Sequence, residues 1–594
     1  MLSGLAKREA LMLYFRYYLT LLLTQKGFRL NISPEPGIDL NWGRENGISE
    51  IWCWDQSFPL WLAEIIHQDF RSLLSEGTGL SFRRINRGIR KTTQRYNYSG
   101  TGRWIRLTEC SSLQHSFYTS KDQVELYIEK YLPGRELTSA ELVGALSRTG
   151  VAVNKNSLEF YLHQMILKGR VQRRAGIGLD EIGRFYCRRC GERERIHQEY
   201  LQAASFPCRV CPSCRNLGVL SDLTPLYHWL GNLPEAKGWS PPELVLPELT
   251  LWQSQAAERI LDFWQKDSVH NTLLVWAVCG AGKTEVVFPV IQRALSQGKR
   301  VLLTVPRREV VKELSARIKR SFPGMSFTLL YGGKKQEQPG SLFMVATTHQ
   351  LLRFSPYFHL VILDEADAFP FRDNPMLNAA LNKVILPTGK KIYMTATPDG
   401  SWRRKASRSK IEIVRIPLRY HGHLLPVPTL LRSRLPSKSK WFIPKVLKVF
   451  LFNLREQNRK GLIFLPRVEQ VEEFGKKLKS KDPNIDYIHS QDPLKEEKIK
   501  RFTSGSLSVL ITTTLLERGL TFKHLDVMVL FADQQRVFSP ETLVQIAGRV
   551  GRSAEDPDGR VWFVAETVSP AMKEARKWVL RMNMEARKMK YRSS

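Results

Sequence analysis

Cysteine, acidic side chains and long uninterrupted apolar runs are all scarce in this chain. Eight cysteines among 594 residues, five of them between 187 and 214, do not resemble the disulfide framework of a secreted protein. The apolar stretch at 11–23 contains Arg16 and is too short to span a bilayer, so we expect a core helix there. We recognise no signal peptide and no transmembrane segment, and these absences favour the cytoplasm.

Basic side chains, by contrast, are abundant. Lys and Arg number 90 against 57 Asp and Glu, which gives a formal net charge of +33. A hydrophobic fraction of 43% excludes disorder as the source of this charge. We therefore expect a folded protein that meets a polyanion, either nucleic acid or an anionic membrane surface. A merely soluble basic protein accounts poorly for so large an excess.

A phosphate-binding loop is the clearest motif. The apolar run 273–276 predicts a short buried strand, and a helix is predicted to follow the loop. Small residues between the two let backbone amides and a helix N-terminus face phosphate oxygens. Lys283 is placed to neutralise the β- and γ-phosphates, and Thr284 to ligate magnesium. The three small residues expected to contact the nucleotide are Gly280, Ala281 and Gly282.

Two further groups of residues indicate that the nucleotide is hydrolysed. Asp364 and Glu365 follow the apolar run 361–363, so they are predicted at the carboxyl end of a buried strand. Asp364 is expected to hold magnesium through water, and Glu365 to orient or deprotonate the attacking water. Far downstream, two guanidinium groups are expected to stabilise charge that develops on the γ-phosphate. This third group comprises Gln545, Arg549 and Arg552.

Two C-x-x-C pairs about 20 residues apart predict a structural zinc site, because four thiolates complete a tetrahedron. The second pair is ambiguous, since Cys208 precedes Cys211 and Cys214. We favour Cys187, Cys190, Cys211 and Cys214 as ligands, with Cys208 as the alternative. A redox-active C-x-x-C pair is the rival interpretation.

The rest of the sequence indicates how the chain is divided into domains. A capping-box pattern at 138–141, a second helix near 157–168 and a basic strand at 170–174 suggest a winged helix or an ordinary helical hairpin. From about 249, apolar strands alternate with helical patterns in two series, which indicates an α/β fold with two parallel-sheet domains. The predicted units are an N-terminal mixed region of unknown role (1–135), a possible winged helix (136–180), a four-cysteine zinc module (181–220), a linker (221–247), two α/β domains (248–405 and 406–570) and a basic C-terminal helix (571–594).

The motif order resembles a known family. Residues 249–567 resemble the tandem RecA-like core of superfamily-two DEAD/DEAH-type helicases, with an A-x-x-G-x-G-K-T loop from Ala277 and Q-x-x-G-R-x-G-R from Gln545. The four-cysteine module, the segment 419–422 and Leu516-Glu517-Arg518-Gly519 are similar to the late-competence DNA-uptake helicases, the ComFA family. This resemblance covers about residues 180–570. Thr521 departs from the pattern, because many relatives have a ribose-contacting Asp there.

The resemblance implies further roles. Gln253 would read the adenine of ATP, and Gly519 would lie near the nucleotide. Arg307, Thr347 and Thr348 would hold the phosphates of a nucleic-acid strand. Thr395 and Thr397 would couple hydrolysis to movement.

The implied function is an ATP- and magnesium-dependent translocase or helicase on single-stranded DNA that powers uptake of transforming DNA in competent bacteria. It would work with other competence proteins at the inner face of the cytoplasmic membrane, as a peripheral protein. A replication-restart or repair helicase of the primosomal type is the alternative. A DNA-binding scaffold that ATP merely switches is an alternative of another class.

Overall fold

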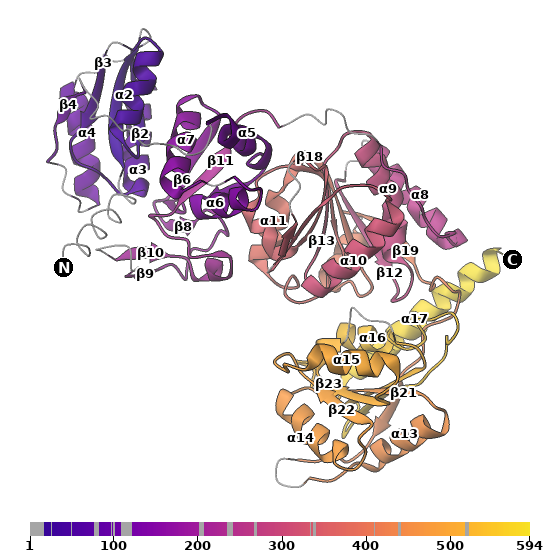
Figure 1. Cartoon of the computed structure of the whole chain (residues 1–594). Helices are drawn as coiled ribbons and strands as arrows, with labels where there is room; N and C mark the ends of the chain where they lie inside the picture. The colour runs from indigo at the N-terminus through magenta and orange to yellow at the C-terminus, as the bar shows by residue number, and fades with distance from the viewer. Residues whose placement is uncertain are drawn as a thin grey trace.

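A computed structural model describes residues 17–593 except 25–26, 49, 76–81, 97, 99–100, 108–120, 152, 201–206, 234–240, 267–269, 333, 337–339, 409, 438–440 and 517–521. Four parts follow one another along the chain, from an N-terminal sheet to two larger α/β domains (Figure 1). Each helix among the described residues is too short or too polar to cross a bilayer.

The N-terminal part is an antiparallel sheet in the order β2-β1-β3-β4, packed against helices. Residues 18–24 form its central strand β1, so the prediction of a core helix at 11–23 is wrong for this segment. The reason is that β1 is buried on both faces, with Leu19 and Leu21 on one and Thr20 and Leu22 on the other, so its apolar run resembles that of a buried helix. The elements are β1 (Tyr18–Thr24), β2 (Gly27–Ser33), α2 (Pro36–Glu45), β3 (Glu50–Trp54), α3 (Leu60–Ser75), α4 (Phe82–Arg95) and β4 (Trp104–Arg106).

The next part has the order helix, strand, helix, helix, strand, strand. Its sheet runs β5-β11-β6, and all pairs are antiparallel. The capping box at Thr138 is confirmed, because its hydroxyl accepts from the Glu141 backbone and the Glu141 carboxylate accepts from the Thr138 backbone. The unit also includes a helix and a strand outside the predicted bounds 136–180. The elements are α5 (Lys121–Tyr131), β5 (Glu136–Thr138), α6 (Ser139–Ser147), α7 (Lys155–Leu167), β6 (Val171–Ala175) and β11 (Pro225–Trp229).

The cysteine-rich module is inserted between β6 and β11, as one long excursion from that small sheet. It consists of two short hairpins and a 3-10 helix that carries the last cysteine. The elements are β7 (Ile177–Leu179), β8 (Phe185–Cys187), β9 (His197–Glu199), β10 (Cys208–Val210) and η1 (Pro212–Leu217).

The two predicted parallel-sheet domains are confirmed, and both are RecA-like. The first sheet has the order β15-β14-β16-β13-β17-β18-β12-β19, and every pair except β14–β15 is parallel. Its strands are β12 (Thr272–Ala277), β13 (Val301–Val305), β14 (Thr328–Tyr331), β15 (Lys334–Gln336), β16 (Phe343–Thr347), β17 (Phe358–Leu363), β18 (Ile385–Thr395) and β19 (Glu412–Ile416). Its helices are α8 (Leu251–Gln265), α9 (Lys283–Ser296), α10 (Arg308–Ser321), η2 (Thr348–Arg353), α11 (Pro375–Lys383) and α12 (Gly400–Ser407).

The second sheet is parallel throughout, in the order β20-β25-β24-β21-β23-β22. Its strands are β20 (Thr429–Arg432), β21 (Lys460–Phe464), β22 (Ile485–Ile488), β23 (Val509–Thr512), β24 (Leu525–Leu530) and β25 (Val561–Ala565). Its helices are α13 (Lys445–Glu456), α14 (Val468–Lys479), α15 (Lys495–Ser504), η3 (Thr514–Leu516), α16 (Pro540–Ala547) and α17 (Pro570–Ser593).

The passage from the first domain to the second lies later than the sequence pattern suggested. Residues 412–416 form β19, which pairs with β12 and so belongs to the first sheet, although the predicted boundary was at 405. This edge strand has one paired neighbour, and its register depends on that contact rather than on a local signal. The C-terminal helix α17 packs on α16 and also reaches the first domain, where the Trp276 and Trp578 rings meet edge to face.

Candidate functional site

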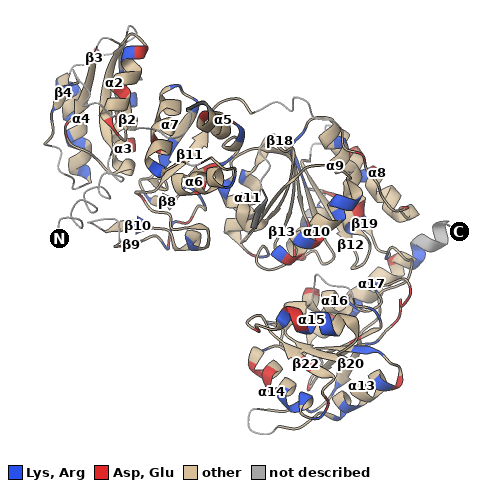
Figure 2. Ribbon diagram, in the orientation of Figure 1, with Lys and Arg blue, Asp and Glu red and all other residues tan. Residues whose placement is uncertain are grey.

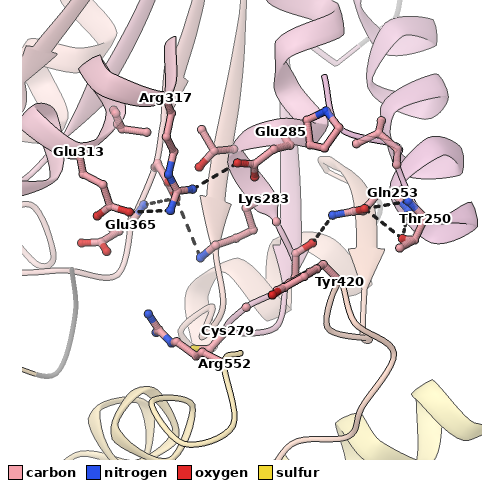
Figure 3. A pocket seen from close by; sticks show the side chains of 18 of the residues that line it. Thr250, Gln253, Cys279, Lys283, Glu285, Glu313, Arg317, Glu365, Tyr420 and Arg552 are labelled. Carbon is pink, nitrogen blue, oxygen red and sulfur yellow. Dashed lines mark hydrogen bonds and ion pairs between the residues drawn. The ribbon is translucent and has the colours of Figure 1, made fainter. Parts of the chain in front are cut away.

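The phosphate-binding loop lies at the carboxyl end of β12, beside a cavity of about 490 Å³ (Figure 3). The loop turns through two left-handed glycines, Gly280 with φ 82° and Gly282 with φ 70°. Gly282 caps the N-terminus of α9, so the amides of that helix face the cavity. A Cβ at Gly282 would lie 2.3 Å from Nε2 of Gln253, so the Gln253 side chain would have to move, and the left-handed φ itself favours glycine.

The cation and the two carboxylates expected at the phosphates come together at this cavity. Lys283 Nζ lies 4.0 Å from Asp364 Oδ1. Burial raises the pKa of the Asp364 carboxyl, and the Lys283 charge opposes that shift. Glu365 has a φ of 53°, and its backbone N–H donates to Asp364 Oδ1 at 2.7 Å. This left-handed backbone is strained for a residue with a side chain, and it places Glu365 on the cavity wall.

The second domain reaches the same cavity through Gln545 on α16. Its Nε2 donates to Asp367 Oδ2 and to Thr397 Oγ1, both at 3.1 Å. Its Oε1 accepts from Cys279 Sγ at 3.0 Å. Thr397 Oγ1 also donates to Asp367. One buried amide therefore joins the phosphate loop, the carboxylate segment and the Thr395–Thr397 segment of the first domain.

The two arginines that follow Gln545 differ in position. Arg552 lines the cavity, and its Nε donates to the Gly548 carbonyl at 3.0 Å. Arg549 is buried, with 1% of its surface exposed, and is not among the residues of the cavity wall. The closed arrangement thus presents Arg552 to the nucleotide space and keeps Arg549 within the protein.

The predicted adenine reader, Gln253, lines the cavity and is also engaged within the protein. Its Nε2 donates to the Ala281 carbonyl at 3.0 Å, and its Oε1 accepts from the Thr250 backbone at 2.9 Å. Gln253 therefore supports the phosphate loop directly. Thr284 lines the same cavity, and Thr395 is buried behind it, where its hydroxyl accepts from the Thr397 backbone at 3.0 Å.

The residues expected to bind the phosphates of a nucleic-acid strand lie at one edge of the first sheet. Arg307 follows β13 and precedes α10, while Thr347 and Thr348 stand where β16 ends. Because β13 and β16 are neighbours, the three positions share the carboxyl edge. Thr347 and Thr348 are both buried in this conformation. Gly519 lies outside the described residues.

Sequence reasoning did not assign several polar side chains of the cavity wall, among them Tyr420, Arg317 and Glu313. Tyr420 comes from the segment between the domains, and its backbone N–H donates to the Gly280 carbonyl at 3.1 Å. Arg317 on α10 lies between Glu285 and Glu313, with Nη1 3.4 Å from the Glu285 carboxylate. The family-like segment 419–422 was the available signal for Tyr420. For Arg317 and Glu313 no local pattern pointed to the site.

Four cysteines form a separate, buried cluster. The sulfur atoms of Cys187, Cys190, Cys211 and Cys214 lie within 4.8 Å of one another. Two of the distances are 3.6 Å (Cys187 to Cys214) and 3.5 Å (Cys190 to Cys211). A tetrahedral zinc with bonds of about 2.3 Å separates its sulfurs by roughly 3.8 Å, so the donor set fits that ion. Cys208 lies outside the group, although it is also buried.

Glu141 connects the cysteine module with the first RecA-like domain. Its carboxylate accepts from Arg189, which lies between Cys187 and Cys190, at 2.6 Å. The same carboxylate accepts from Arg353 at 2.5 Å. Arg353 ends η2, the element that begins at Thr348. The contacts from Arg189 to Glu141 and from Glu141 to Arg353 therefore connect the cysteine cluster with the segment expected to bind a nucleic-acid strand.

Family comparisons cover these parts in order. The Competence protein ComFA N-terminal domain matches residues 121–228, the Type III restriction enzyme res subunit matches 246–400, and the Helicase conserved C-terminal domain matches 443–554. Competence protein ComFA of Bacillus subtilis is 33% identical over 455 residues, which are 75% of this chain and 94% of the relative. The chain belongs to the ComFA family. The ComFA of Streptococcus pneumoniae is 33% identical over 412 residues, 68% of this chain and 92% of the relative.

The chain also has more distant relatives. The transcription-repair-coupling factor of Staphylococcus haemolyticus is 25% identical over 339 residues, 52% of this chain and 26% of that protein. The ComFA N-terminal match coincides with the unit from α5 to β11 and includes the cysteine cluster. The chain is thus a competence-associated member of superfamily two, with its N-terminal sheet preceding the family's own domains.

Proposed function

We propose that this ComFA-family protein is a DNA-dependent ATPase that translocates on single-stranded DNA and drives the uptake of transforming DNA. One observation carries the proposal: the nucleotide cavity is lined from both RecA-like domains, with Lys283 on one side and Gln545 and Arg552 on the other. A site divided in this way is complete only when the domains meet. ATP binding and product release would therefore close and open the cleft.

The residues of the site have distinct tasks in this proposal. Loop amides and Lys283 hold the phosphates, and Glu365 orients the attacking water and takes its proton. Magnesium held by Thr284 and Asp364 would supply positive charge to the phosphates. Arg552 stabilises the charge that develops on the γ-phosphate. The network of Gln545, Asp367 and Thr397 reports domain closure to the hydrolytic segment.

The cysteine cluster is proposed to hold zinc in a structural role. Four thiolates leave no open coordination position, so Cys187, Cys190, Cys211 and Cys214 would fix the geometry of the inserted module. The unit around it has the element order of a winged helix, and we propose that it positions DNA. Interaction with other competence proteins at the cytoplasmic face of the membrane completes the proposal.

ATPase rates with single-stranded DNA, duplex DNA and RNA test the nucleic-acid specificity. We expect single-stranded DNA to stimulate turnover most, and stimulation to fall steeply with salt because the contacts are largely ionic. Preferred stimulation by RNA would contradict the proposal.

Movement is tested separately with the Glu365→Gln variant. The amide keeps the shape of the carboxylate but cannot accept the proton, so we expect ATP binding to persist while turnover and displacement of streptavidin from a single strand stop. A variant that still supports transformation would point to an ATP-switched scaffold. Efficient unwinding of forked duplexes by the wild-type protein would favour replication restart or repair.

A further inference from the structure

We propose that the exposed face of α4, in the N-terminal part, binds the phosphate backbone of duplex DNA. This site is separate from the nucleotide cavity and from the strand-holding edge of the first sheet, and it does not depend on the proposed motor activity. It assigns a role to a part of the chain that precedes the ComFA N-terminal domain, whose match begins at 121.

Helix α4 is cationic along one side and carries no acidic residue (Figure 2). Successive residues rise by about 1.5 Å, so its exposed cations extend over roughly 18 Å of helix. Duplex DNA presents about one phosphate per 1.7 Å of its axis, so this length faces several phosphates. The exposed cations are Arg83, Arg87, Arg90, Lys91 and Arg95.

These cations have no carboxylate partner within the part of the chain that the structure describes. Helix α14 provides the contrast, because its Lys476, Lys477 and Lys479 are paired with acidic side chains at 3.6, 2.8 and 2.8 Å. The charge of these lysines is already balanced within the protein. Unpaired cations in a row are available to a polyanion.

The opposite side of α4 holds the helix in place. Ile85, Ile89 and Thr93 are buried in the N-terminal core, and Thr92 donates to Asp69 on α3 at 2.6 Å. The cationic side chains therefore stand on a packed element, and binding does not have to order the helix first. Such a preformed row loses less conformational entropy on binding than a basic tail does.

The N-terminal part is also fixed to the unit that follows it. His163 Nε2 and Asp39 Oδ2 lie 2.9 Å apart, and both side chains are fully buried. Arg188 of the cysteine module pairs with Glu64 on α3 at 2.8 Å. DNA held on α4 is thus anchored to the part of the molecule that contacts the first RecA-like domain.

The chemistry of the face favours duplex DNA over two other polyanions. An interfacial helix inserts apolar side chains into a membrane, whereas the apolar side of α4 is turned into the protein core. Single-strand binding sites add aromatic side chains on which bases stack, and the exposed positions of α4 carry none. Contacts limited to phosphates suit a duplex, whose bases are already stacked.

Salt titrations of binding to a short blunt duplex, without ATP, test the proposal. The variant combines Arg87→Ala, Arg90→Ala and Lys91→Ala in the full chain. The control combines Lys476→Ala, Lys477→Ala and Lys479→Ala, which removes the same charge from α14. We expect the α4 variant to reduce the slope of log K against log salt by about 2.7, since each phosphate contact contributes about 0.9. The control should retain the wild-type slope.

Further arms identify the partner. Arg87→Lys and Arg90→Lys together change two positions of the alanine variant, keep their charge and should keep the slope, which assigns the loss to charge. Equal slopes for the α4 variant and the α14 control would overturn the proposal. The proposal would also be overturned if the α4 variant lost binding to phosphatidylserine vesicles but kept duplex binding. An equal loss of binding to an oligothymidine single strand would overturn it as well. Glu365→Gln should retain duplex binding, and the α4 variant should retain strand-stimulated ATPase, so the two proposals fail separately.

Discussion

Individual side chains make the contact between the two RecA-like domains. Gln545 spans from α16 to three segments of the first domain, and it is 4% exposed. Arg419 lies beside it, fully enclosed, and donates to the carbonyls of Val550 at 2.8 Å and of Gly551. The two side chains differ in their hydrogen bonding: the Gln545 amide both donates and accepts, whereas the Arg419 guanidinium only donates. Arg419 thus holds the two residues that precede Arg552, and Gln545 lies on the helix that leads to them.

Gln545→Ala should slow ATP hydrolysis by about 10- to 100-fold, because it leaves buried partners of the amide unsatisfied when the domains close. ATP affinity should change little, since the phosphate loop keeps its own contacts. Steady-state turnover and binding of a fluorescent ATP analogue measure the two effects. Gln535→Ala, at an exposed position outside the junction, should behave as wild type. An unchanged turnover number for Gln545→Ala would refute the role of this junction.

Arg419→Lys should lower turnover by about tenfold with a smaller effect on KM. Burial lowers the pKa of Arg419 to about 10, and its planar fork reaches two carbonyls that a single ammonium cannot reach together. Arg419 is a positioning residue, so the split between kcat and KM is the informative measurement. Arg432→Lys, exposed at the end of β20, is the matched control. A fall in the melting temperature with normal kcat would indicate a structural role instead.

At the scale of elements, the cysteine module is inserted into the small sheet of the preceding unit. The cysteine module leaves the small sheet after β6 and returns at β11, so its position depends on contacts at its base. Glu141 is the main polar contact there, since it joins Arg189 to Arg353 and caps α6 as well. Arg189 is buried, and Glu141 and Arg353 are mostly enclosed, so removal of the carboxylate should destabilise this contact.

Glu141→Ala should cost up to about 3 kcal/mol at this contact, because the buried Arg189 and the partly buried Arg353 lose their shared carboxylate. Hydrogen exchange of η2 should accelerate, and stimulation of the ATPase by single-stranded DNA should fall while the basal rate persists. Glu129→Ala removes a surface carboxylate that pairs with Arg170, and should cost less than about 1 kcal/mol. Unaltered exchange in η2 would show that the triad does not connect the module to the motor.

The attachment of the N-terminal part to the rest of the protein depends on buried ionisable groups. Burial lowers the pKa of His163 despite the nearby Asp39 carboxylate, so the imidazole is neutral in the folded protein. For Asp39, burial acts to raise the pKa, but His163 and neighbouring hydrogen bonds hold it below its ordinary value. Acidification therefore opposes the folded state at both groups.

Unfolding experiments between pH 7 and 5 should show this dependence. The unfolded state binds a proton at His163 more readily than the folded state does, so stability falls as the pH drops below about 6.5, by at most about 1.4 kcal/mol per pH unit. His163→Gln can still donate to Asp39 but does not titrate, and its stability should fall less. His67 and His359 also have pKa values lowered to about 4. They are present in the wild type and in the His163→Gln variant, so their contribution is the same in both. Parallel pH curves would exclude His163 as the source.

Sequence reasoning succeeded where a few consecutive residues carry the signal. The phosphate loop, the acids after β17, the capping box at Thr138 and the buried runs 273–276 and 361–363 are of this kind, because turn glycines, caps and buried runs act over short distances. It did not anticipate that residues 18–24 form a central strand or that β19 joins the first sheet. Both features depend on which strands pair with these segments, and those partners are distant in the sequence.

Local chemistry thus indicated the phosphate-binding loop, the grouping of four cysteines and the RecA-like class of the two large domains. Tertiary structure decided which side chains meet: Gln545 with Asp367 across 178 positions, Glu141 with Arg353 across 212, and Tyr420 with the phosphate loop. It also separated Arg552, on the cavity wall, from the buried Arg549. The physical reason is that such contacts depend on how sheets and helices pack, and no short segment contains that information.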